Sequence, residues 1–449
     1  MVTYRQRVRE IERRLAGRRL VYFGTRGTDA RPLLEISNFE EVFSQIAPLE
    51  AVSIQETCLE TLKKERVDLD RYSIDQDTSE AVHEIRKGLL RAFSRPTAVI
   101  PYRPSAVLAS ACFTRANLVQ YMGLFHEFQA CFEHKPWIET QLAEIGVRIV
   151  PWRYFADDDI ALIREAAETG PLVLRTNRSD GGAGLTLVQK PSELQNEWPV
   201  HGEGFLAAAP FLTPAIPINV NACVFPGGEV SLHAPSLQLI GIPSCTSRHF
   251  GYCGNDFARI ADLEREILGD LEKIVVTTGR WLGRQGYLGA FGVDAIVHAG
   301  TVYLVEVNPR FQGSSVLAAT LARELDRPDL FLDHISAFLD LPAPEHMSMA
   351  EIARQQPKLS HVVSHNLANA PVRIEIEASD RLPLRCTLLP HPEVVISAEG
   401  ILFDAILPQT VTETGMELVP EVANQLNLVL REIAKGAPAF AAILQSTGP

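Results

Sequence analysis

Apolar residues recur at helical spacing in several stretches, and these stretches predict the main helices of the chain. Near the N-terminus, Tyr4, Val8, Ile11 and Leu15 fall on one face, as expected when every third or fourth residue packs inward. Gly17 follows and predicts the end of this helix. The same spacing predicts further helices at 79–93, 138–145 and about 259–282, and a last helix that runs from Pro420 to Gly436.

Short apolar runs bounded by glycine, proline or polar residues predict the strands. Their expected positions are 19–23, 97–100, 147–150, 172–175, 185–189, 205–212, 218–225, 290–297, 301–307, 372–376, 394–396 and 401–406. His298-Ala-Gly300 predicts a hairpin turn between two of these strands. Gly24-Thr-Arg-Gly27 predicts a tight turn after the first strand, because it lacks the third glycine of a dinucleotide-binding fingerprint.

The chain has 449 residues, which is more than one hydrophobic core usually organises, so several packed domains are expected. Strands alternate with helices over 1–125, a pattern that favours an open α/β layer. Residues 126–345 form the predicted central domain, with a glycine-loop subdomain at about 135–208, and 346–449 predict a small α+β module. The expected fold class is a multidomain combination of α/β and α+β.

Charge and composition argue against two classes of protein. The net charge is −13, with 55 acidic and 42 basic residues, whereas nucleic-acid scaffolds bind phosphate through Lys and Arg. No run approaches the ~20 apolar residues needed to cross a bilayer, and the first residues lack the apolar stretch of a signal peptide. We therefore expect no nucleic-acid partner, no membrane partner and a cytoplasmic location.

The cysteines and histidines do not predict a metal site. Seven cysteines are scattered without a CxxC pair, so free buried thiols are expected. Cys245, His249 and Cys253 offer three zinc ligands at most, and structural zinc takes four. His361 and His365 have the spacing of a pair on a helix but no acid at metal spacing, so we interpret them as surface residues.

A glycine-rich segment between two predicted strands has the composition of a phosphate site. Gly181, Gly182 and Gly184 fall within four residues, and such glycines let several backbone N–H groups point at one anion. Arg175, at the end of the incoming strand, is placed to grip the same anion with two N–H groups. The segment is not a P-loop, because it leads into a strand. An ordinary hairpin whose glycines serve its turn is the alternative.

A second hairpin carries carboxylates in an apolar setting. Glu306 and Asn308 are two residues apart on one strand, so their side chains point to the same face, and Asp294 lies across the turn. Two carboxylates and an amide oxygen form a site suited to magnesium that bridges nucleotide phosphates. Arg310, just beyond the strand, is placed to stabilise charge on a transferring group. A solvated strand face with a salt bridge is the alternative.

The order of these features resembles the ATP-grasp superfamily of carboxylate–amine ligases. The matching segments are His134-Lys-Pro-Trp137 with its helix, 146–151, Arg175 with the loop 179–184, Gly292-Val-Asp294, and Glu306-Val-Asn-Pro-Arg310. The resemblance implies an ATP-grasp fold, with an N-terminal α/β pre-ATP-grasp domain and a small C-terminal α+β module. It also implies ATP and Mg²⁺ as cofactors, with Mn²⁺ as the alternative metal.

Carried over position by position, the resemblance assigns a role to each matching residue. The groups that would contact the ATP phosphates are Lys135, Arg175 and the loop residues Ser179, Gly181, Gly182, Ala183 and Gly184. The groups that would hold adenine are the backbone carbonyl of Pro210, Phe211 and the N–H of Leu212. The residues that would hold the metal are Asp294, Glu306 and Asn308, and Arg310 would meet the acyl phosphate. The acid that commonly holds the ribose is missing from 214–219.

The resemblance implies a ligase that activates a carboxylate as an acyl phosphate, which an amine then captures with release of ADP and phosphate. Neither flank resembles the biotin carboxylase or D-alanine ligase arrangement. The layout and the segment 217–223 look more like the peptide ligase of pheganomycin biosynthesis, which implies an amino acid or guanidino acid joined to a peptide. Arg248, in a polar segment predicted beside the active site, is expected near the transferred carboxylate.

Other functions stay open at this stage. A ligase that makes a thioester or a different amide, a small-molecule kinase, and a nucleotide-binding protein without catalysis are the alternatives. The expected partners are a small carboxylate and a peptide or amine, and a homodimer is an open alternative.

Overall fold

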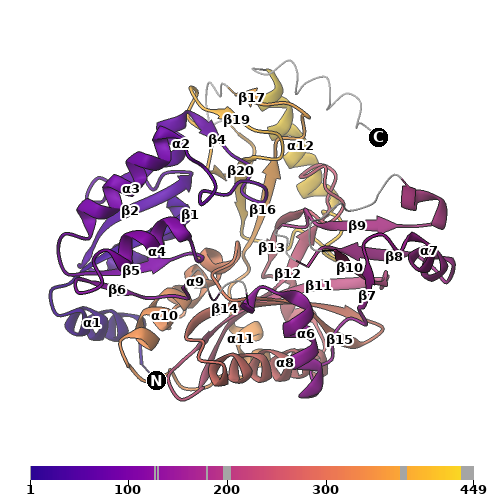
Figure 1. Cartoon of the computed structure of the whole chain (residues 1–449), viewed down its shortest axis with the longest axis horizontal. Coiled ribbons are helices and arrows are strands. Elements are labelled where there is room, and N and C mark those ends of the chain that lie inside the picture. Colours follow the sequence, from indigo (N-terminus) through magenta and orange to yellow (C-terminus); the bar gives the residue numbers. More distant parts are fainter. Residues whose placement is uncertain are drawn as a thin grey trace.

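The computed structural model of the chain describes residues 2–125, 128, 131–177, 181–195, 204–374 and 382–435. Within these residues the strands form four sheets, and the helices pack against their faces (Figure 1). Gly436, the predicted end of the last helix, and Ser179, a predicted phosphate contact, lie outside the described residues.

The first sheet is parallel and is built from N-terminal residues. Its strands, in spatial order, are β3 (Gln55–Cys58), β2 (Phe39–Ile46), β1 (Arg19–Arg26), β5 (Thr97–Pro101) and β6 (Val119–Tyr121). Every residue of β1 is buried, as expected for a strand covered on both faces. Leu20 and Tyr22 pack on one face, while Val21 and Phe23 pack on the other, which follows from the two-residue period of a strand.

Helices cover both faces of this parallel sheet. On one face lie α1 (Tyr4–Leu15) and the 3-10 segment η1 (Gly27–Glu35). On the other lie α2 (Leu59–Lys63), α3 (Glu80–Ala92) and α4 (Ala106–Phe113). The predicted N-terminal helix, which Gly17 was expected to end, is confirmed as α1, with a capping box at Thr3 that satisfies otherwise unpaired N–H groups.

The largest sheet runs through the middle of the molecule and is antiparallel. Its eight strands, in spatial order, are β15 (Thr301–Asn308), β14 (Gly289–His298), β11 (Ala215–Val224), β12 (Val230–Ile240), β13 (Tyr252–Asp256), β16 (Ser360–His365), β20 (Ile401–Leu407) and β18 (Cys386–Thr387). Residues 360–407 therefore extend the same sheet that 215–308 begin. The predicted hairpin turn at 298–300 is confirmed by positive φ angles at Ala299 and Gly300.

The two faces of this central sheet differ in what covers them. The long helix α8 (Arg265–Arg284) packs on the face that carries Ile218, Val220 and Phe291, together with α11 (Met349–Gln355). The opposite face carries Asn219 and Asn221 on the alternate positions of β11. One end of that face is covered by α10 (Leu330–Phe338), and α9 (Ser315–Glu324) lies beside it. The rest of the polar face lines a cavity.

A smaller antiparallel sheet stands at the right of Figure 1. It contains β7 (Arg153–Ala156), β10 (Phe205–Pro210), β8 (Leu172–Arg175) and β9 (Leu185–Val188). Its core packs against α7 (Ile160–Glu168) and the 3-10 segment η2 (Pro191–Gln195). The helix α6 (Lys135–Glu144) precedes this sheet and contacts β15 of the central sheet.

The C-terminal residues contact the N-terminal ones through a short three-stranded sheet. Its strands are β17 (Val372–Arg373), β19 (Val395–Ile396) and β4 (Glu65–Arg66), and α12 (Pro420–Lys435) packs on the neighbouring core. Arg66 is buried and donates to Glu60 and to the carbonyl of Ile401. A buried arginine needs such partners to offset its lost hydration, so this contact joins two parts of the chain that are far apart in sequence.

Several element predictions were wrong in detail. The first strand does not turn at Gly24 but runs to Arg26, because Gly24 and Arg26 still pair with β2. Residues 147–150 form a single bridge at Ile149 and not a strand. The helix predicted from about 259 begins at Arg265, after the 3-10 segment η3 (Arg259–Asp262). The strand predicted at 372–376 is described only at Val372–Arg373.

Two further features concern the molecule as a whole. Parallel and antiparallel sheets occur together with helices, so the predicted mixture of α/β and α+β is confirmed. Among the described residues, no helix combines the length and the apolar character that spanning a membrane requires.

Candidate functional site

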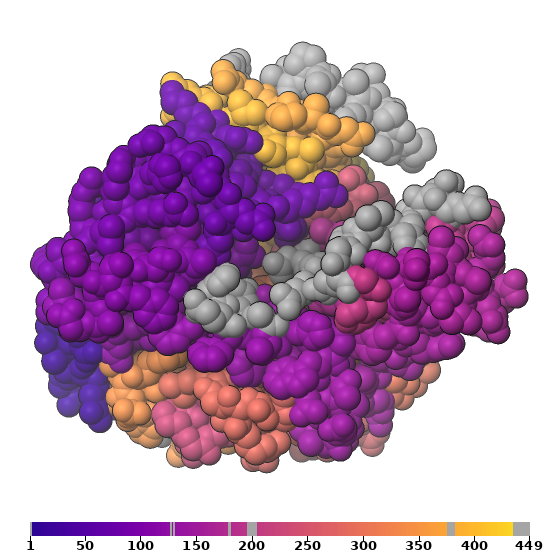
Figure 2. Space-filling view, viewed as in Figure 1, coloured from indigo at the N-terminus to yellow at the C-terminus, as the bar shows by residue number. Residues whose placement is uncertain are grey.

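A cavity of about 390 Å³ lies where the N-terminal sheet, the small sheet and the central sheet meet. Figure 2 shows the molecular surface hollowed between the N-terminal, C-terminal and small-sheet parts of the chain. The size falls within the range of ordinary ligand pockets. Its floor is the polar face of the central sheet, opposite the face that α8 covers.

Asp294 on β14 lies at the centre of the polar floor. Its Oδ1 accepts from Asn219 at 2.7 Å, from Gln238 at 2.9 Å and from Gln312 at 3.3 Å. Its Oδ2 accepts from Asn308 at 3.0 Å. Burial and the nearby charge of Glu306 raise the pKa of Asp294 to about 6, although the amide hydrogen bonds act in the opposite direction. The side chain is therefore a buried carboxylate whose negative charge is only partly compensated.

The structure brings the three predicted metal ligands together. Asp294 pairs directly with Glu306 across the two strands, and a bulge follows in β15, where Val305 is left without a partner in the register. Bulges re-aim side chains beside functional sites, and here Val305 and Glu306 both line the cavity. Asn308, two residues after Glu306 on β15, donates to the same Asp294 carboxylate. The two carboxylates and the amide can each offer an oxygen atom, which is the ligand type that Mg²⁺ prefers. Asp294 Oδ2 accepts one hydrogen bond, so it keeps a lone pair for a metal. This set of side chains therefore fits Mg²⁺.

Cationic groups flank the carboxylates. Lys135, at the start of α6, places its Nζ 3.1 Å from Glu306 Oε1. Arg310 lines the cavity, with its Nε 3.7 Å from Glu133 Oε1. We call Asp294, Glu306 and Asn308 the carboxylate cage. Because Lys135 and Arg310 are both close to it, an anionic ligand that reaches the cage meets positive charge from two sides.

The turn that contains Gly181, Gly182 and Gly184, called the glycine hairpin below, lies close to Asp70 and Phe250. Gly181 and Gly182 have φ of +55° and +76°, a region that favours glycine. A Cβ on Gly181 would lie 2.1 Å from the Asp70 carboxylate, and one on Gly182 would lie 2.1 Å from the carbonyl oxygen of Phe250. Both glycines line the cavity, whereas Ala183 is exposed and Gly184 is buried. The hairpin therefore needs glycine for its close approach as well as for its turn.

Arg175 is held away from the cavity by a partner that the sequence did not reveal. Its guanidinium donates to both oxygens of Glu139, at 2.6 and 2.9 Å. It also lies over the ring of Trp152, at 4.0 Å from the centroid, an arrangement that favours a cation. Glu139 accepts a further hydrogen bond from Tyr154 at 2.8 Å. Arg175 does not line the cavity, so direct contact with phosphate stays a prediction.

The segment predicted to hold adenine lies along one edge of the cavity. Pro210, Phe211 and Leu212 all line it, next to Trp152 and Val173. The N–H of Phe211 donates to the carbonyl of Pro171 at 2.9 Å. Contact of the Pro210 carbonyl and the Leu212 N–H with adenine stays a prediction.

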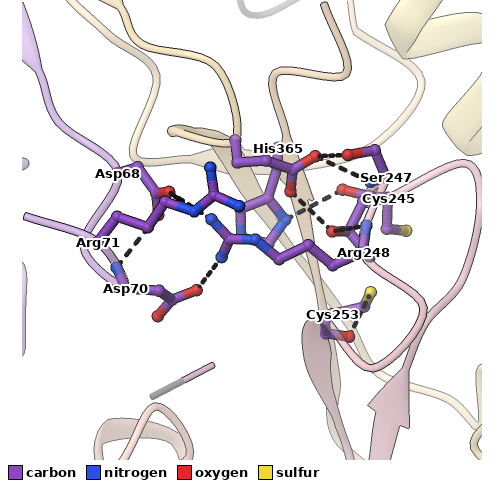
Figure 3. Close-up of polar contacts among 11 residues, drawn as sticks. Asp68, Asp70, Arg71, Cys245, Ser247, Arg248, Cys253 and His365 are labelled. Atoms are coloured by element: carbon purple, nitrogen blue, oxygen red, sulfur yellow. Dashed lines mark hydrogen bonds and ion pairs between the residues drawn. The ribbon is translucent and has the colours of Figure 1, made fainter. Parts of the chain in front are cut away.

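Arg248 contacts the N-terminal region and does not line the cavity. Its guanidinium donates to Asp68 and Asp70, and Figure 3 shows both carboxylates pointing toward it. The neighbouring residues Thr246 and Ser247 donate to Glu399 from the C-terminal part of the chain. The expected contact between Arg248 and a transferred carboxylate stays a prediction.

Two predicted surface histidines are buried on a strand. His361 is 3% exposed and His365 is 8% exposed, and both lie on β16. The Nδ1 of His361 is 3.2 Å from Asp404 Oδ2, and the Nδ1 of His365 is 3.0 Å from the carbonyl of Cys245. The surface interpretation was wrong because four-residue spacing was taken as helical, whereas these residues continue the central sheet.

The residues that surround Asp294 were not predicted from the sequence. Asn219 and Asn221 alternate with apolar residues on β11, and this alternation of amides in a hydrophobic strand was an available signal. Gln238 and Gln312 come from segments with no comparable pattern. Cavity-lining residues of the N-terminal part, including Arg26 and Arg103, were missed as well.

Comparison with known proteins identifies the fold. A family model described as an ATP-grasp domain matches residues 214–314, the segment that contains Asn219, Asp294, Glu306 and Asn308. No curated protein matches the chain at the threshold applied. The family match places the carboxylate cage within a recognised domain.

Solved structures cover nearly the whole chain. Biotin carboxylase from Campylobacter jejuni superimposes with a TM-score of 0.60 at 13% identity and covers 95% of each chain. N5-carboxyaminoimidazole synthetase from Staphylococcus aureus, complexed with ADP, gives a TM-score of 0.56 at 10% identity and covers 88% of this chain and 94% of that one. Carboxyaminoimidazole ribonucleotide synthase from Aspergillus clavatus, complexed with ATP, gives 0.55 at 14% identity, covering 94% and 99%.

Together, the family match and these superpositions show that the chain has the ATP-grasp fold, as the sequence predicted. One expectation about the flanks is corrected. The biotin carboxylase match covers 95% of each chain, so at the level of fold the flanks do resemble the biotin carboxylase arrangement. Sequence reasoning missed this similarity because the identity is only 13% and fold is retained when most residues have changed.

Proposed function

We propose that this protein is an ATP-dependent ligase that activates a carboxylate as an acyl phosphate and joins it to an amine, with release of ADP and phosphate. The observation that carries the proposal is the cage of Asp294, Glu306 and Asn308 on the floor of a cavity, with Lys135 and Arg310 beside it. The matching ATP-grasp domain, and the ADP and ATP named for two similar structures, support the use of ATP.

The proposed chemistry follows from charge. Mg²⁺, when bound, would neutralise the repulsion between the triphosphate and the incoming carboxylate. Asp294, Glu306 and Asn308 would hold the metal, and the four amides around Asp294 fix its orientation. Lys135 would balance phosphate charge, and Arg310 would stabilise the acyl phosphate and the oxyanion that forms next.

Two steps complete the reaction. A carboxylate oxygen attacks the γ-phosphorus, and the bond to the β-phosphate oxygen breaks to give ADP. The amine then attacks the acyl carbon, the new C–N bond replaces the C–O bond to phosphate, and the amine loses a proton. The glycine hairpin, packed against Asp70 and Phe250, would exclude water that otherwise hydrolyses the intermediate.

The finer assignment is a peptide ligase that joins an amino acid or guanidino acid to a peptide or amino acid, as in natural-product biosynthesis of the pheganomycin type. The support is the resemblance in layout and in segment 217–223, together with cavity-lining groups of both charges. Under this assignment the protein takes small molecules, uses Mg²⁺ or Mn²⁺ and works in the cytoplasm. A second candidate is a kinase that releases a stable phosphate ester, because the same cage would serve phosphoryl transfer to a hydroxyl.

The experiment that separates these functions uses hydroxylamine as a trap. The protein is incubated with ATP, Mg²⁺, a panel of amino acids and guanidino acids, and hydroxylamine. A hydroxamate formed together with ADP supports an acyl phosphate, whereas a stable phosphorylated product supports the kinase. Release of AMP contradicts both functions.

A substitution in the cage gives a sharper prediction. Glu306→Gln removes one negative charge and almost no volume, so we expect ADP formation to fall by at least a hundredfold while the thermal midpoint stays close to that of the wild type. The loss is expected because electrostatic stabilisation in such sites contributes several kcal/mol to the rate. Wild-type turnover by this variant would contradict the metal assignment.

A further inference from the structure

A second chamber, of about 440 Å³, adjoins the main cavity on the side of Lys135. It shares Glu306 and Asn308 with the main cavity, so the two spaces meet at the carboxylate cage. Thr25, Asp70 and Arg103 are shared as well, and the remaining lining comes mainly from the N-terminal region, including Gln45 of β2, with Lys135 of α6 beside it. A molecule in this chamber would therefore lie beside the metal cage on the side of the N-terminal sheet.

The position of the chamber follows from the topology of that sheet. The chain adds β2 and β3 on one side of β1, and then β5 and β6 on its other side, so the order in which strands are added reverses between β1 and β5. In open parallel sheets, ligands bind in the crevice beyond the carboxyl ends of the strands at such a reversal. Thr25, near the carboxyl end of β1, and Arg103, just after β5, both line the chamber.

Gln45 is the observation that points to a ligand. It lies near the carboxyl end of β2, is 2% exposed and lines the chamber. Its Oε1 is buried without a hydrogen-bond partner, and its Nε2 donates to no other described residue. Buried amides are almost always paired, because an unpaired buried polar group is costly. A side chain amide that lines a chamber with both ends unpaired is suited to a ligand that offers a donor and an acceptor together.

The charged groups of the chamber narrow the class of ligand. Arg103 and Lys135 contribute positive charge, while Asp70 and Glu133 contribute negative charge. A lining of both signs suits a molecule that carries both an ammonium and a carboxylate group. The N–H and C=O groups of a peptide or amino acid would also match the two ends of the Gln45 amide.

We propose that this chamber binds the amine-bearing co-substrate, and that this co-substrate is an amino acid or the amino end of a peptide recognised by Gln45. The inference rests on the proposed ligase function for its reaction, because the amine must approach the acyl phosphate beside Glu306 and Asn308. Gln45 thereby determines specificity and does not take part in bond making.

The test is a binding measurement that needs no turnover. Glycylglycine, which offers an ammonium, a carboxylate and one peptide group, is titrated against the full-length protein with ligand-observed NMR, beside ethylamine and acetate as single-charge probes. We expect glycylglycine to bind the wild type and to bind Gln45→Leu at least tenfold more weakly. Ethylamine and acetate should bind both proteins equally weakly. Equal binding of glycylglycine to the two proteins, or none to the wild type at millimolar concentration, overturns the proposal.

A matched control separates recognition from a structural role. The Nε2 of Gln356 donates to the backbone carbonyls of Pro235 and Phe257, while its Oε1, like that of Gln45, has no partner. Gln356→Leu therefore removes a buried amide that is paired through its nitrogen. We expect Gln356→Leu to lower the thermal midpoint and leave glycylglycine binding unchanged. Gln45→Leu should not lower the midpoint, since it removes an unpaired amide, and a clear drop would show that Gln45 is structural.

Binding of a nonhydrolysable ATP analogue with Mg²⁺ should be the same in both variants and the wild type. Its loss in the wild type would count against the proposed function and not against the chamber.

Discussion

Glu139 and Arg175 show how one residue pair fixes the position of a charged side chain near the nucleotide site. Their side chains are 5% and 3% exposed, and they form two hydrogen bonds in a planar, fork-like contact. An arginine cannot lose its proton when buried, so it needs a carboxylate partner in that environment. Glu139 lies on α6 one turn after Lys135, and the pair thereby connects that helix to β8 of the small sheet.

Removing one partner of this ion pair should cost more than removing both. Glu139→Leu leaves Arg175 buried without a carboxylate, and we expect the free energy of unfolding to fall by about 3–5 kcal/mol. The double variant Glu139→Leu with Arg175→Met has no unpaired charge and should recover most of that loss. Urea unfolding of the single and double variants measures both values. A loss below about 1 kcal/mol in the single variant, a value typical of exposed pairs, would contradict the account.

For single residues, the sequence predicts which side chains share a face of one strand, but not which side chains from other strands lie beside them. The two-residue period placed Glu306 and Asn308 on one face, and the structure has both of them beside Asp294. Asn219 and Gln238 reach the same carboxylate from other strands, and their approach depends on a strand order that local spacing does not contain. For the same reason Glu139 was not foreseen as the partner of Arg175.

The glycine hairpin is the element whose conformation the proposed reaction depends on most directly. Gly182→Ala combines a positive φ with a Cβ only 2.1 Å from the Phe250 carbonyl oxygen, so the hairpin cannot keep its present position. We expect ADP formation to fall by at least tenfold. Gly204→Ala is the matched control, because it has a similar φ of +76° and open space around its Cβ. Both variants share the backbone cost of about 1 kcal/mol, so equal activity in the two would contradict a role for the close approach.

The helix α10 is joined to two other elements by a buried histidine that should make stability depend on pH. His334 lies 2.7 Å through Nε2 from the Met122 carbonyl and accepts at Nδ1 from the Ala290 N–H at 3.0 Å. Burial lowers its pKa from 6.5 to about 4, although the hydrogen bond to Met122 acts in the opposite direction. The native state therefore keeps the ring neutral, while the unfolded chain takes up a proton near pH 6.5.

The sign of the pH effect follows directly. Between about pH 6.5 and pH 4 the unfolded state binds more protons, so the free energy of unfolding falls as the pH falls, by about 3 kcal/mol from this group. His334→Gln keeps a donor and an acceptor but does not titrate. Between pH 6.5 and pH 4, we expect the free energy of unfolding of the wild type, measured by urea unfolding, to fall by about 3 kcal/mol more than that of His334→Gln. A difference that stays constant with pH would contradict the assignment.

Elements were predictable where their pattern is local. The helix at 4–16 and the hairpin at 298–300 follow from apolar spacing and turn residues. The strands β12 and β16 were missed, because each is paired on both sides within the central sheet. Long-range pairing then decides the conformation of a segment whose own pattern is ambiguous.

At the scale of the whole molecule, one loop between β12 and β13 joins the three parts of the chain around the cavity. Arg248 binds Asp68 and Asp70 from the N-terminal part, while Thr246 and Ser247 bind Glu399 from the C-terminal part. Figure 3 shows Asp68, Asp70, Ser247 and Arg248 close together. Asp70 in turn lies against Gly181 of the hairpin. The loop is therefore placed to couple the position of the N-terminal sheet to closure of the glycine hairpin.

This coupling differs from the sequence expectation that Arg248 contacts the transferred carboxylate, and the two can be separated by kinetics. Arg248→Met removes the guanidinium that binds Asp68 and Asp70, so we expect faster hydrogen exchange at 68–70 and at 246–251, together with a lower kcat for ADP formation. The triple variant that adds Asp68→Asn and Asp70→Asn also removes the two negative charges that Arg248 balances, and it should recover much of both losses.

Arg71→Ala is the control, because that arginine faces Asp68 at 4.0 Å but is 72% exposed, and exposed pairs contribute little. If Arg248 instead binds the carboxylate substrate, Arg248→Met should raise KM for the acid, and the two Asp→Asn changes should not restore it. A rise in KM without rescue would therefore support the substrate contact, whereas rescue with unchanged KM supports coupling through the loop. The three contacts of the loop favour the second outcome, since the guanidinium that would grip a substrate is already bound to two carboxylates.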